Sequence, residues 1–123
     1  MTQRFMFARS QRLTRSEDFA QVYSYGTHQA DATLVVNVAS NNQPFCRMGL
    51  SVSRHVGGAV LRNRWKRAIR EAFRLNQTEL PTGFDIVVRP RRGATFCPKQ
   101  IDHSLCELVC RAVTELSLHS KTP

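Results

Sequence analysis

The chain has 123 residues, of which 41% are hydrophobic, so it suits one compact domain and is too apolar to be disordered. Eighteen lysines and arginines against nine acids give a formal net charge of +9, which indicates a polyanionic partner: RNA, DNA or an anionic membrane surface. No apolar run reaches the ~18 residues of a membrane span, and no signal-peptide pattern occurs. We therefore expect a cytoplasmic protein that does not bind membranes.

The N-terminal segment, residues 1–15, carries four arginines and no acid, with aromatic and aliphatic residues between them. Two interpretations of this segment are possible. It is either a flexible basic arm or a segment held across the domain by Phe7 and Leu13, and its aromatic residues favour the second.

A short helix is predicted next, with Ser16 as its N-cap, two acids in its first turn and Gly26 as its C-terminal stop. Phe19, Val22 and Tyr23 share one face of this helix. On one interpretation Phe19 and Tyr23 are core residues. On the other, their exposed edges stack on unpaired bases.

Three stretches have the pattern of strands. Residues 27–39 are rich in β-branched residues, with a possible break near Ala30–Asp31, and Asn37 interrupts the apolar run and is predicted to point to the solvent-exposed face. Residues 46–53 alternate, with Arg47, Gly49, Ser51 and Ser53 on a polar face that is either washed by solvent or the floor of a ligand site. Residues 84–90 form the third strand, and the turn at residues 89–93 adds positive charge.

Residues 62–74, RNRWKRAIREAFR, form the most cationic stretch and are predicted to be an amphipathic helix. One side carries Arg62, Asn63, Lys66, Arg67, Arg70 and Arg74. The other side carries Leu61, Trp65, Ala68, Ile69, Ala72 and Leu75, with Phe73 at the border. Charged helix faces are usually only solvated, but like charges four residues apart cost ~0.2–0.5 kcal/mol per pair. The repeat of cations at this spacing therefore favours nucleic acid as the partner.

The Gly57–Gly58 pair before this helix lacks the residues of a phosphate-binding loop, so we reject that interpretation. Residues 101–116 have the apolar spacing of a second long helix that covers the core, and residues 117–123 are expected to fray. Cys106, Cys110 and His103 have the spacing of metal ligands on this helix. However, no second ligand pair is placed to complete a zinc site, so packing residues are favoured.

No catalytic cluster is recognisable. The nine acids are scattered, with no spacing typical of a two-metal site, and no serine or cysteine lies in a nucleophile-elbow pattern. We therefore expect no catalytic and no metal-binding residues in the protein itself, and a binding surface that is cationic.

With these elements placed, the stretch GLSVSRHVGGAVLRNRWKRAIREAFR, residues 49–74, closely resembles the protein component of bacterial ribonuclease P. Two further pieces, F…RLTRSEDFAQVY and FDIVVRP, support the resemblance. It implies a single α+β domain with the order αβββαβα, a mixed four-stranded sheet, a ribosomal-protein-like fold and a left-handed βαβ crossover. The fourth strand would come from splitting residues 27–39.

The resemblance also implies a function. The family protein binds a large catalytic RNA and the 5′ leader of precursor tRNA, and the RNA with bound Mg²⁺ cuts the leader off. The protein itself is expected to be monomeric. The helix facing the catalytic RNA would supply Arg62, Asn63, Arg64, Lys66, Arg67, Arg70 and Arg74. The leader cleft would contain Phe7, Arg12, Leu13, Phe19, Tyr23 and Asn37. Trp65, Gly58 and Asn37 depart from the residues that the family usually has at these positions.

Two other hypotheses remain. The chain could be a structural RNA-binding protein of ribosomal type without a role in cleavage. It could instead be a DNA-binding regulator that places the basic helix in a major groove, but the sequence shows no dimerisation element to support this.

Overall fold

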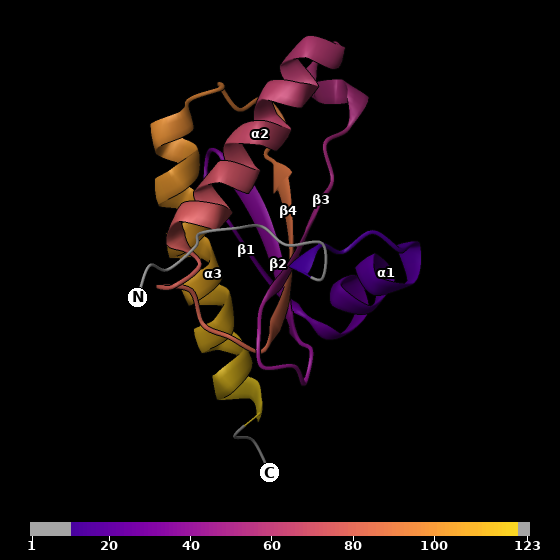
Figure 1. Ribbon diagram of the computed structural model, residues 1–123, viewed down its shortest axis with the longest axis vertical. Coiled ribbons are helices and arrows are strands. Elements are labelled where there is room, and N and C mark those ends of the chain that lie inside the picture. The colour runs from indigo at the N-terminus through magenta and orange to yellow at the C-terminus, as the bar shows by residue number, and fades with distance from the viewer. Residues whose placement is uncertain (1–10, 121–123) are drawn as a thin grey trace, which may run out of the picture.

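The computed structural model describes residues 11–120, and their side chains as far as residue 118. The elements are α1 (Ser16–Tyr25), β1 (Thr27–Ala30), β2 (Leu34–Ser40), β3 (Arg47–Leu50), the 3-10 turn η2 (Arg54–Val56), α2 (Ala59–Asn76), β4 (Phe84–Pro90) and α3 (Pro98–Ser120). This order confirms the predicted αβββαβα arrangement of a single α+β domain (Figure 1).

The four strands form one mixed sheet in the order β1-β2-β4-β3. All neighbours are antiparallel except β3 and β4, which are parallel and are joined through α2. The predicted break near Ala30–Asp31 is confirmed. There the Asp31 carboxylate accepts hydrogen bonds from the backbone N–H groups of Thr33 at 2.8 Å and Leu34 at 3.0 Å, which closes the turn between β1 and β2.

Helices α2 and α3 cover one face of the sheet and enclose the main core (Figure 1). Two predicted positions on α2 are wrong. Phe73 is fully buried rather than at the border, and Leu75 is 51% exposed rather than part of the apolar face. The reason is that α2 packs against α3 as well as the sheet, so its buried stripe includes Phe73 and excludes Leu75.

Helix α1 lies on the opposite face of the sheet (Figure 1). A smaller cluster joins them, formed by Leu13, Val22, Ala39 and Val87, with Phe19 packed at its margin. Arg15 rather than Ser16 is the N-cap, and no side chain caps this helix end, so the predicted cap at Ser16 is wrong by one residue. The predicted stop at Gly26 is confirmed, since its N–H bonds to the Val22 carbonyl at 2.9 Å.

Two element ends differ from the expectation. The strand predicted over residues 46–53 is shorter, because the chain leaves the sheet after Leu50 and turns into η2. Helix α3 continues to Ser120, so residues 117–120 are helical, and residues 121–123 of the predicted frayed tail lie outside the described residues. The sequence after Pro98 contains no glycine or proline before Pro123 that would end this helix earlier.

Candidate nucleic-acid interface

The outer surface of α2 carries the predicted cationic residues. Asn63, Arg64, Arg67 and Arg70 are exposed, and Arg62, Lys66 and Arg74 are half-buried. Within the described part of the chain, the cations of this set form no ion pair except Arg74, which pairs with Glu71 one turn away. The hydrogen bonds from Arg74 lower the pKa of the Glu71 carboxyl. The unpaired charges on this helix are therefore available to an external anion.

Leu13 and Phe19 lie together on the other side of the sheet. Leu13 is buried, and its N–H bonds to the Met48 carbonyl at 3.0 Å, so this part of the N-terminal segment is held on β3 rather than free. Gly49 lies directly beneath both side chains, because a Cβ there would be 2.5 Å from Phe19 Cζ and 2.9 Å from Leu13 Cβ. Phe19 is thus partly a packing residue, as one of the two interpretations proposed.

Two other predicted cleft residues are accessible beside this contact. Tyr23 is 44% exposed on α1, so its ring is available for stacking. Arg12 is exposed. Its backbone bridges to Met48 of β3, and the residue also lines a groove beside α2. Phe7, the remaining N-terminal residue of the predicted cleft, lies outside the described residues.

Asn37 does not point to a solvent-exposed face as predicted. It does lie on the sheet face opposite the main core, but it is only 8% exposed, because α1 covers that face. Its neighbours across the sheet are His28 on β1 and Val87 on β4. Its side-chain oxygen has no hydrogen-bond partner among the described residues, so a buried acceptor is left unsatisfied on this face of the sheet.

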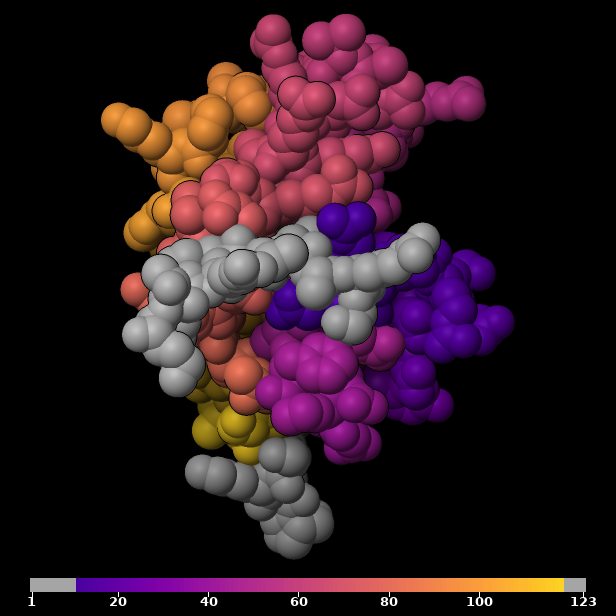
Figure 2. Space-filling model, in the orientation of Figure 1, coloured from indigo at the N-terminus to yellow at the C-terminus, as the bar shows by residue number. Residues whose placement is uncertain are grey.

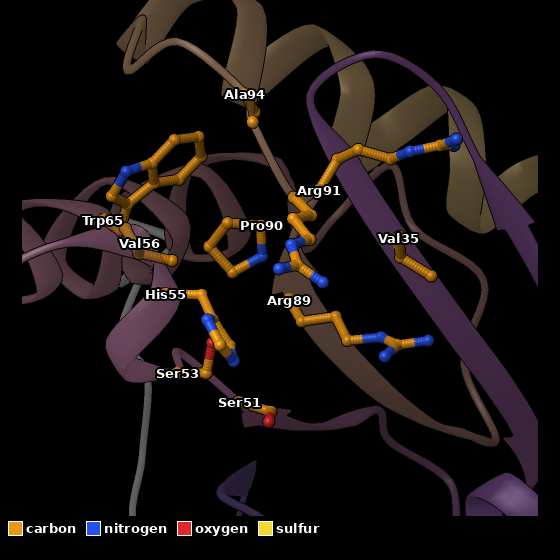
Figure 3. A pocket seen from close by; sticks show the side chains of 12 residues that line it. Val35, Ser51, Ser53, His55, Val56, Trp65, Arg89, Pro90, Arg91 and Ala94 are labelled. Carbon is orange, nitrogen blue, oxygen red and sulfur yellow. The ribbon is translucent and has the colours of Figure 1, made fainter.

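A pocket of about 460 Å³ opens on this face, beyond Asn37 along the sheet. Val35 of β2 and Arg89 of β4 are paired neighbours that line it, and Ser51 lines it where the chain leaves β3. Figure 3 shows the side chains of Arg89 and Arg91 on one side of this space and Ser53 and His55 below it.

The walls of this pocket differ in character. Arg89, Arg91 and Arg92 supply a cationic wall, and none of them belongs to an ion pair within residues 11–118. Val56 and Trp65 supply an apolar wall opposite (Figure 3). We call this site the arginine pocket. A cationic wall facing an apolar wall suits a nucleotide, whose phosphate is charged and whose base is flat and largely apolar.

The residues of the arginine pocket were not predicted to form a site. Two features of the sequence nevertheless indicate them, the polar face with Ser51 and Ser53 and the positive charge of residues 89–93. What the sequence alone could not show is that β2, β3, η2, α2 and β4 converge at one place.

The described residues contain no group of three His, Cys, Asp or Glu side chains close enough together to hold a metal ion, so no magnesium site is assigned to them. Over the same part of the chain, none of the helices combines the length and the hydropathy that crossing a bilayer requires.

Comparison with known proteins identifies the family. The family model described as Ribonuclease P matches residues 7–113. The chain belongs to the ribonuclease P protein family. The ribonuclease P protein component of Clostridioides difficile (strain 630) is 41% identical over 116 residues, which is 91% of this chain and 98% of the relative.

Solved ribonuclease P proteins share the fold. The structure from Staphylococcus aureus gives a TM-score of 0.75 at 36% identity and covers 83% of this chain and 94% of its own. The structure from Thermotoga maritima gives a TM-score of 0.75 at 33% identity and covers 81% of this chain and 96% of its own. The resemblance seen in residues 49–74 is therefore confirmed as family membership, and the protein is part of an endoribonuclease.

Proposed function

We propose that the chain binds the catalytic RNA of ribonuclease P through α2 and the 5′ leader of precursor tRNA through the α1 side of the sheet. In this way it assists removal of the leader and formation of the mature tRNA 5′ end in the cytoplasm. The observation that carries this proposal is the pair of cationic surfaces on α2 and in the arginine pocket. Family membership implies an RNA partner, and among residues 11–118 the cations of these surfaces other than Arg74 form no ion pair.

The contribution of α2 is electrostatic. Its exposed cations neutralise phosphates of a folded RNA, and the counterions released from the RNA favour binding. Trp65, Ile69 and Phe73 are buried on the opposite side of the helix and fix it to the core. The cations are therefore presented by a rigid element, which lowers the entropic cost of binding.

The contribution of the α1 side is to hold a single strand. Tyr23 offers an aromatic surface for stacking, and the guanidinium groups of the arginine pocket offer partners for phosphates. A base-paired duplex would not fit both features, because its bases are already stacked inside the helix. The leader is the single-stranded part of the substrate, so this surface suits it.

Hydrolysis of the phosphodiester bond is assigned to the RNA subunit and the Mg²⁺ that it binds. The residues of this chain position the substrate and reduce the repulsion between two polyanions that have to lie side by side. A structural RNA-binding protein without a role in cleavage is the second candidate, since the charge on α2 alone would serve it equally well.

One experiment separates the two candidates. The purified protein is added at low magnesium to a bacterial ribonuclease P RNA that is active alone at high magnesium, and cleavage of precursor tRNA is measured. We expect the protein to restore cleavage. Tight binding of the RNA without any restored cleavage would instead support the structural candidate.

A further inference from the structure

A second groove, of about 720 Å³, lies between α2 and the connection that leads from β4 into α3. Its floor is apolar and is made by Ala68, Phe96 and Pro98. Arg64, Arg67 and Arg70 stand around it, and its lining also includes Arg12, Glu71 and Arg74. Figure 2 shows the start of α3, in orange, beside the surface of α2, in rose. We call this site the α2 groove.

The aromatic ring in the α2 groove is held in place from behind. Phe96 meets Trp65 edge to face, with ring centroids 5.5 Å apart and an interplanar angle of 76°, and Trp65 is almost fully buried. Because its partner is packed in the core, the half-buried ring of Phe96 rests on a well-packed surface. When a flat ligand contacts this ring, the protein loses little side-chain entropy.

Ala68 provides the space in the α2 groove. It lies one turn after Arg64 and three residues before Glu71, and it is half-buried where the apolar side of α2 meets the charged side, so its methyl group forms part of the floor. Contacts to phosphates alone would need cations and no apolar floor. The combination of an apolar floor, a fixed aromatic ring and surrounding guanidinium groups is the one used for unpaired bases in RNA.

We propose that the α2 groove binds one unpaired nucleobase of the catalytic RNA, with the flanking phosphates on Arg64, Arg67 and Arg70. This inference rests on the proposed function and adds a specific contact to it. Glu71 lines the same groove, and its carboxylate retains acceptor positions beyond those used by Arg74. An acceptor at this place favours a base with an exocyclic amino group, which adenine, guanine and cytosine have and uracil lacks.

The test fills the groove without changing any charge. In Ala68→Leu the larger side chain occupies the place of the base, and in the matched control Ala59→Leu the same side chain is added to the exposed first turn of the same helix. Circular dichroism and thermal unfolding establish that both variants fold. Each full-length protein is titrated against a bacterial ribonuclease P RNA, and base accessibility is mapped with dimethyl sulfate for adenine and cytosine and with a glyoxal for guanine.

We expect Ala68→Leu to weaken RNA binding about tenfold with an unchanged salt dependence, because one stacked base is lost and the phosphate contacts remain. At saturating protein, one unpaired adenine, cytosine or guanine should be protected by the wild type and by Ala59→Leu and should react in the Ala68→Leu complex.

The proposal is overturned if no base differs between these complexes, or if Ala68→Leu binds as tightly as Ala59→Leu. It is also overturned if the free protein forms a dimer that Ala68→Leu dissociates, which would assign the groove to a second copy. Failure of the proposed function gives a different result, since the wild type itself would then not restore cleavage.

Discussion

Arg47 and Asp85 face each other across the parallel strands β3 and β4 and form a two-point ion pair. Arg47 Nε lies 2.8 Å from Asp85 Oδ1, and Arg47 Nη2 lies 2.6 Å from Oδ2. The side-chain amide of Asn41 donates a third hydrogen bond to Asp85 at 2.9 Å. Strand β3 is short and lies at the edge of the sheet, so this pair is a major link between it and β4.

Replacing Asp85 with alanine should therefore destabilise the protein. Asp85 is only 7% exposed, and the loss of its carboxylate leaves a half-buried guanidinium and an amide without this acceptor. We expect the free energy of unfolding to fall by about 2 kcal/mol. Urea unfolding followed by the fluorescence of the single tryptophan measures it. In the control, Arg15→Ala removes the exposed pair with Asp18 and should lower the free energy of unfolding much less, because solvent screens an exposed ion pair. Equal losses in the two variants would contradict the assignment.

The charge on α2 gives a prediction about salt. Arg67→Ala should weaken binding to the catalytic RNA and should reduce the slope of log affinity against log salt by roughly one, because one phosphate contact is lost. The control is Arg111→Ala on α3, which removes the same charge from a residue that is paired with Glu107. Binding isotherms over a range of salt concentrations give both slopes. If the two variants had the same slope, α2 would not be the surface that contacts RNA.

The arginine pocket gives a prediction about the leader. The double variant Arg89→Ala, Arg92→Ala should weaken binding of precursor tRNA to the reconstituted enzyme and leave binding of mature tRNA nearly unchanged, since only the precursor has a leader. Arg67→Ala should weaken both to a similar extent, because it acts on the catalytic RNA. The ratio of the two affinities is the measurement. An unchanged ratio in the double variant would show that the leader does not bind in the arginine pocket.

The cysteines give a prediction about pH. Burial raises the pKa of the Cys106 thiol to about 11 and raises that of Cys46 above its ordinary value, whereas Cys97 and Cys110 are exposed. A raised pKa leaves the thiol protonated at pH 8, and only the thiolate reacts with iodoacetamide. Mass spectrometry after brief labelling at pH 8 should therefore find Cys97 and Cys110 modified first. Labelling of Cys106 should accelerate as the pH rises towards 11. Early modification of Cys106 at pH 8 would contradict its burial.

Much of the fold could be predicted because its elements have strong local patterns. The β-branched run over residues 27–39 predicts a strand with a break near Ala30–Asp31, and the family resemblance implies its division into β1 and β2. The stretch FDIVVRP coincides with β4. The positions of Phe73 and Leu75 could not be predicted in this way. A helical projection assumes one buried direction, whereas α2 is buried against two surfaces at once.

The candidate site could be predicted only where its residues are close in sequence. The cations of α2 lie on one helix, so their spacing in the sequence was sufficient to predict that they share one surface. Asn37 was placed in solvent because nothing near it in the sequence shows that α1 packs on this face of the sheet. The arginine pocket joins residues between Val35 and Ala94, and such convergence depends on the parallel pairing of β3 with β4.

Helix α2 forms part of both surfaces proposed to bind RNA. Trp65 on its inner side is a wall of the arginine pocket, and Arg67 on its outer side belongs to the α2 groove. A packed helix is about 10 Å across and does not change its width. If both surfaces bind as proposed, the spacing between leader and catalytic RNA is set by the thickness of one helix. This spacing does not depend on nucleotide sequence, so the same protein would be able to bind every precursor tRNA of the cell.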